Sequence, residues 1–230
     1  MNGFRLAFPA SAIAGKDELT AADVAVLRKY IFPNGVLCHQ DATTLLVLNG
    51  CCPVKCPEWE RYFVESLAQF VLHYCYPQGS LDEVNADWIE ATLATDGVIN
   101  SRLELDALLH IMELSAEVPP SLSRLALDQL HHALRDNTGP LRSAPRPEEK
   151  GIDSADMDFI IKVLRNDFAG EHLRLASEQI GALLRIADVV AGRQNVDGWE
   201  PLLKAVSLRR GTVPMRAPAL HLAARRREGA

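Results

Sequence analysis

The chain has 230 residues, which is enough for one large domain or two small ones with packed cores. Hydrophobic residues make up 48% and charged residues 23%, and no apolar run approaches the ~20 residues of a membrane-spanning helix. Aromatic residues are only 6%, while Leu and Ala are abundant, a composition that favours helices over sheets. We therefore expect a soluble, all-α protein whose default location is the cytoplasm.

Charge is unevenly distributed along the chain. The net charge is -6, but residues 209–230 hold six Arg and one Glu, a balance of +5. Residues 1–208 therefore carry about -11, from 18 basic and 29 acidic side chains. An acidic body is a poor partner for nucleic acid, because contacts to phosphate dominate that affinity. We interpret residues 209–230 as a basic, flexible, solubilising tail that could also bind an anionic partner.

Apolar residues recur at intervals of three and four over most of the chain, which is the pattern of amphipathic helices. Residues 1–18 lack it and are expected to be a flexible N-terminal segment, not a secretory signal. The pattern in the rest of the chain predicts about nine helices and at most two short β-bridges, at 35–37 and 97–99. The predicted helices span 20–32, 39–49, 57–74, 81–94, 101–116, 119–136, 153–167, 174–191 and 196–208.

One segment, 137–151, contains three Pro and two Gly and has no apolar periodicity. Such a composition is typical of a linker. It divides the chain into a helical domain at 19–136, which holds two related three-helix units, and a third related unit at 152–208.

The relation between the units is a predicted internal repeat. Residues 20–68 and 153–207 both show Ala-Asp, a helix, a Gly turn, a helix, a loop and Trp-Glu. Residues 85–112 repeat the central helix–Gly-turn–helix part. Trp59 and Trp199 occupy equivalent positions before apolar helices, and we predict that both anchor the core instead of stacking on a ligand.

The five cysteines all lie in the first third of the chain. Cys38, Cys51, Cys52 and Cys56, with His39, could supply four metal ligands. However, no second CxxC or HxxxH partner follows, and a cytosolic chain keeps its thiols reduced. Free thiols are the favoured interpretation, and a metal bound by this cluster is the alternative.

The stretch TDGVINSRLELDALL (95–109) has the outline of a calcium-binding helix-loop-helix. With Gly97 at the sixth loop position, Asp96 is the single carboxylate among the expected ligands. Calcium takes six to eight oxygen ligands, so an ordinary EF-hand site is excluded. Asp96 is instead expected to hold the turn, and Ser101 with Glu104 to form a capping box for the next helix. A divalent-metal site that uses Asp96, Glu104 and neighbouring acids such as Asp106 is the alternative.

DGVINSRLELDALLHIM (96–112) resembles the acidic turns of TerB-like tellurite-resistance proteins, which are all-helical and often proposed to bind metal. Over about 19–207, the order of the turns and helices also resembles a set of uncharacterised α-proteobacterial proteins. The acidic metal positions of the TerB-like family match here only at Asp96 and Glu104, and Asn34 stands where the first copy would need Asp. The resemblance implies a helical fold and leaves metal binding to be tested.

Catalytic motifs are sparse: the sequence has no HExxH, GxSxG, Walker loop or GxGxxG. The leading hypothesis is a non-enzymatic helical protein that acts in protein interaction, self-association or a stress response. Divalent-metal binding is the second hypothesis, and an enzyme of unknown class is the third.

Overall fold

The computed structural model describes residues 6–137, 139–142, 146–169 and 172–207. The described residues form ten α-helices and three pairs of two-residue strands, which confirms the all-α fold. The predicted basic tail at 209–230 lies outside the described residues. The α-helices are α1 (Ala10–Ala14), α2 (Ala21–Tyr30), α3 (His39–Cys51), α4 (Pro57–Gln69), α5 (Glu83–Leu93), α6 (Arg102–Leu114), α7 (Pro120–Asp136), α8 (Ser154–Val163), α9 (Ser177–Val189) and α10 (Trp199–Ser207).

Short strands and turns join these helices. A π-helical turn, Phe70–Tyr74, continues α4, and a 3-10 turn, Arg165–Asp167, follows α8. The strands are β1 (Glu18–Leu19), β2 (Val54–Lys55), β3 (Ala94–Thr95), β4 (Val98–Ile99), β5 (Phe168–Ala169) and β6 (His172–Leu173). β1 pairs in parallel with β2, whereas β3–β4 and β5–β6 are antiparallel pairs.

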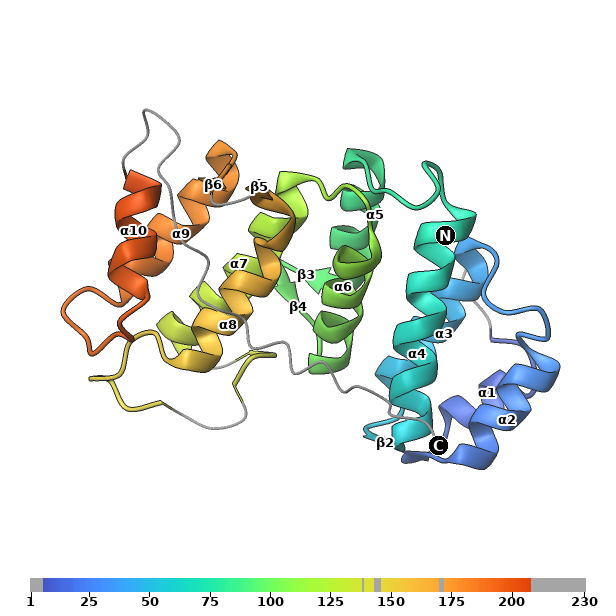
Figure 1. Cartoon of the computed structure of the whole chain (residues 1–230). Helices are drawn as coiled ribbons and strands as arrows, with labels where there is room; N and C mark the ends of the chain where they lie inside the picture. The colour runs from blue at the N-terminus through green and yellow to red at the C-terminus, as the bar shows by residue number, and fades with distance from the viewer. Residues whose placement is uncertain (1–5, 138, 143–145, 170–171, 208–230) are drawn as a thin grey trace, which may run out of the picture.

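The helices follow one another through space in nearly the order of the chain (Figure 1). α1, α2 and α3 lie at one end of the molecule, α5 and α6 in the middle, and α9 and α10 at the other end. The buried apolar residues form one continuous cluster that reaches from Ala10 to Val206. Trp59 and Trp199 are both buried in it, as their place before apolar helices predicts.

Three of the helices begin with the same hydrogen-bonded cap. The side chains of Thr20, Asp82 and Asp153 each accept a hydrogen bond from the backbone N–H of the residue three positions later. The side chain of that later residue in turn accepts a hydrogen bond from the backbone N–H of the capping residue. Such reciprocal caps satisfy two backbone donors that a helix start leaves without partners. The returning side chains, Asp23, Asn85 and Asp156, are buried. The internal repeat itself stays a prediction.

Two details of the predicted elements are wrong. The N-terminal segment is not all loose: Ala10 and Ile13 of α1 are buried, and α1 packs on α3. A five-residue helix is too short to show clear periodicity, so the sequence did not reveal it. The short strands exceed the predicted two: Val98–Ile99 pair with Ala94–Thr95 as expected and residues 35–37 form no bridge, but β1–β2 and β5–β6 are pairs that the sequence did not predict.

The predicted linker 137–151 is anchored to α8 in the part that the structure describes. Arg142 and Arg146 both donate to the carboxylate of Asp156, at 2.8 and 2.6 Å, and Arg146 also binds Asp153. The carboxylate of Asp156 is only 6% exposed. Proline-rich composition therefore described the segment poorly, because two of its arginines pair with a buried acid.

Candidate functional site

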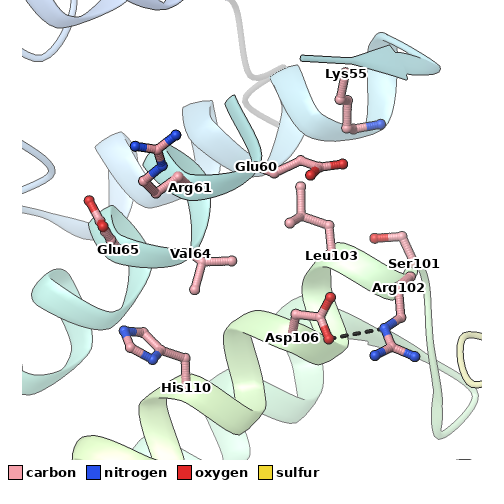
Figure 2. A pocket seen from close by; sticks show the side chains of 10 residues that line it. All are labelled: Lys55, Glu60, Arg61, Val64, Glu65, Ser101, Arg102, Leu103, Asp106 and His110. Carbon is pink, nitrogen blue, oxygen red and sulfur yellow. Dashed lines mark hydrogen bonds and ion pairs between the residues drawn. The ribbon is translucent and has the colours of Figure 1, made fainter. Parts of the chain in front are cut away.

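A groove of about 550 Å³ runs between α4 and α6. Val64 of α4 and Leu103 of α6 point between the two helices and form its apolar centre (Figure 2). Charged and polar side chains surround them on both walls. These are Lys55, Glu60, Arg61, Glu65, Ser101, Arg102, Asp106 and His110.

Some of these charges are already engaged within the chain. Arg102 Nε donates to Asp106 Oδ1 at 3.0 Å, one helical turn away on α6. Lys55 Nζ donates to the carbonyl oxygen of Cys52 at 2.8 Å. Arg61 and Glu65 are exposed, and no ion pair of the described residues includes either of them. The α4 wall therefore presents charges that are available to a partner.

A chain of buried hydrogen bonds joins the three helices α3, α4 and α6. Trp59 Nε1–H donates to Asn49 Oδ1 at 3.2 Å, and Asn49 Nδ2 donates to Glu104 Oε1 at 3.3 Å. All three side chains are buried. Buried polar groups of this kind fix the relative position of the helices that carry them.

Glu104 is the least satisfied member of this chain. Its Oε2 atom is buried and has no hydrogen-bond partner. Burial raises the pKa of its carboxyl above the ordinary value, although the hydrogen bond from Asn49 acts in the opposite direction. The predicted capping box is half correct. Ser101 Oγ accepts from the Glu104 backbone N–H at 3.3 Å, but the Glu104 side chain turns to Asn49 instead of returning the bond.

Asp96 lies in a different environment from Glu104. Asp96 and Gly97 form the two-residue turn between β3 and β4, with φ of 52° and 78°. Positive φ at both positions is the geometry of a type I′ hairpin turn, which Asp-Gly favours. Asp96 is exposed at this turn, whereas Glu104 is buried against α3. Asp106, the third acid of the metal hypothesis, pairs with Arg102 in the groove.

The predicted cysteine cluster is spread over several environments. Cys38 and Cys51 are exposed, Cys56 is half-buried, and the thiol of Cys52 is buried 3.4 Å from the carbonyl oxygen of Ile13. Burial raises the pKa of the Cys52 thiol. None of these four cysteines is in a disulfide bond. Across the part of the chain that the structure describes, no three His, Cys, Asp or Glu side chains are grouped as metal ligands.

The groove contains residues that the sequence did not single out. Leu103 is partly buried against the core and lines the groove with Val64. Arg61 and Glu65 lie on the polar side of α4, opposite the buried residues Trp59 and Phe63. A charged pair four residues apart on a polar helix face is common, so its spacing alone could not mark a site.

Comparison of the chain with models of known protein families, with curated proteins and with solved structures gave no match. The resemblance to TerB-like proteins therefore stays a prediction from the residues quoted above. Among the described residues, no helix is both long and apolar enough to cross a bilayer.

Proposed function

We propose that this protein is a non-enzymatic helical interaction module and that a protein partner binds in the groove between α4 and α6. The observation that carries the proposal is the anatomy of the groove, in which the apolar centre of Val64 and Leu103 is surrounded by charges. Stable protein interfaces have this arrangement, with an apolar core and a polar rim. A helix is the partner element that best fits a groove between two helices. The stress-response role and the cytoplasmic location are further parts of this proposal, and they rest on the sequence.

Site-specific photo-crosslinking in cells tests the groove. A photoreactive residue at Leu103 should yield an adduct with a protein, and the same residue at Asp158, exposed on α8, serves as the matched control. Adduct formation at Leu103 that does not exceed the control would refute the proposal.

Divalent-metal binding is the second candidate, and the unpartnered Oε2 atom of Glu104 is the observation that favours it. A carboxylate oxygen without a donor is a suitable ligand for a hard cation. This candidate predicts that calcium, magnesium, manganese or zinc raises the melting temperature. Because Glu104 is the proposed ligand, the rise should vanish in Glu104→Gln, and also in Asp96→Asn if both acids take part. A melting temperature that none of the four metals changes would remove this candidate.

A further inference from the structure

Helix α4 has a groove on each of its two sides. The groove between α4 and α6 has a counterpart of about 590 Å³ between α4 and α2. Arg61 and Glu65 line both grooves, so they form the ridge between them. Figure 2 shows the two side chains projecting from α4 away from α6, while Val64 points between the helices. This ridge is exposed, and its charges have no ion-pair partner among the described residues.

The charges of the ridge are complementary to a second copy of the same ridge. When two identical helices cross antiparallel about a two-fold axis, a residue on one side of the axis faces the residue equally far on the other side. With the axis at the level of Phe63, Arg61 of one copy faces Glu65 of the other, and the reverse pair forms by symmetry. The same axis places Glu58 near Gln69 of the other copy, and both side chains are exposed and line the groove beside α2.

We propose that the partner of this groove is a second copy of the chain, bound through an antiparallel contact of α4 with α4. In this arrangement, the ridge of each copy enters the groove between α4 and α6 of the other. Val64 and Leu103 supply the apolar centre of the contact, and the two Arg61–Glu65 pairs set its direction. The inference rests on the proposed function, because it names the partner of the same groove.

Charge exchange at the ridge tests this contact. Arg61→Glu leaves four acidic side chains at the contact of two copies, and Glu65→Arg leaves four basic ones. Each single variant should therefore be monomeric in light scattering at low salt, whereas the wild-type chain should have about twice the 25.3 kDa of one copy. An equal mixture of the two single variants should form a heterodimer, because each then offers the charge that the other needs. The double variant, Arg61→Glu with Glu65→Arg, should again be a homodimer.

Asp158→Arg, on the exposed face of α8, is the control and should leave the dimer intact. Unchanged circular dichroism of the single variants would show that both are folded. A monomeric wild-type chain, a dimer that persists in both single variants, or single variants that fail to combine would each overturn the inference. An adduct from Leu103 to a different protein, made by a monomeric chain, would overturn self-association and leave the interaction role standing. If Leu103 gave no adduct above the control, the interaction role would fail as well.

Discussion

The ion pairs of Asp156 provide the sharpest test of how this fold is held together. The Asp156 carboxylate is 6% exposed and receives two guanidinium groups, from Arg142 at 2.8 Å and from Arg146 at 2.6 Å. Asp156→Asn keeps a side-chain oxygen that can accept the backbone N–H of Asp153, so the helix cap can survive. The variant removes the negative charge and leaves two largely buried arginines without it.

Removal of one partner from a buried ion pair costs about 3–5 kcal/mol. We expect a loss near 3 kcal/mol, the lower end of that range, because Arg146 keeps its pair with Asp153. In a domain of this size, 1 kcal/mol corresponds to roughly 2–4 °C, so the melting temperature should fall by about 6–12 °C.

Thermal unfolding followed by circular dichroism measures this loss. Asp158→Asn is the matched control, because Asp158 lies on the same helix but is exposed, and its change should stay within about 0.5 kcal/mol. A loss in Asp156→Asn no larger than that of the control would refute the view that the buried pairs stabilise the fold. Substitution of Arg142 by Gln in the Asp156→Asn background should cost less than it does in the wild type, since its partner charge is already gone.

Three further predictions concern single carboxylates. Because burial raises the pKa of Glu104, its negative charge destabilises the folded state at any pH above the ordinary pKa of 4.5. Glu104→Gln should therefore raise the free energy of unfolding at pH 7 by about 1 kcal/mol. That gain should disappear below about pH 4, where wild-type Glu104 is protonated, and the exposed Glu60→Gln should show no gain at either pH. Burial raises the pKa of Asp153, but the hydrogen bond from the Asp156 N–H and the charges of Arg146 and Arg142 outweigh it, so the pKa is lowered. The charged Asp153 carboxylate therefore stabilises the fold above pH 3.8, and this stabilisation is lost as the pH falls below that value. In urea unfolding, the free energy of unfolding should change less between pH 5 and pH 3 for Asp153→Asn than for the wild-type chain. An equal change in the two proteins would contradict this assignment. Asp96→Ala should cost about 1 kcal/mol in thermal unfolding because φ is positive there, while Asp96→Asn should be nearly neutral; equal losses would argue against the type I′ turn.

The helices were predictable because their buried residues repeat at helical spacing. In α4, Trp59, Phe63 and Leu67 recur every four positions and are all buried. The cap at Ser101 could also be read from the sequence, since the residues of a capping box are close along the chain. Local patterns therefore gave the elements and most of their boundaries.

Contacts between distant residues could not be read in this way. Asn49 and Glu104 are 55 residues apart, and nothing near Glu104 in the sequence indicates that its side chain turns away from its own cap. The same holds for Arg142 and Asp156, which meet only because the segment after α7 folds back on α8. The groove depends on the packing of α4 against α6, so its lining residues became evident only in three dimensions.

Helix α7 has a consequence for how the chain could be divided. It precedes residues 137–151, yet it packs extensively against α9, which follows them, and Asp128 of α7 binds Arg185 of α9 at 2.6 Å. A single backbone break between Arg142 and Arg146 would therefore yield two pieces whose apolar surfaces are complementary and pack against each other. We expect such pieces to remain associated after cleavage, and to reconstitute the whole when they are produced separately. The chain would then work as a split protein, with the junction of α7 and α9 as its point of reassembly.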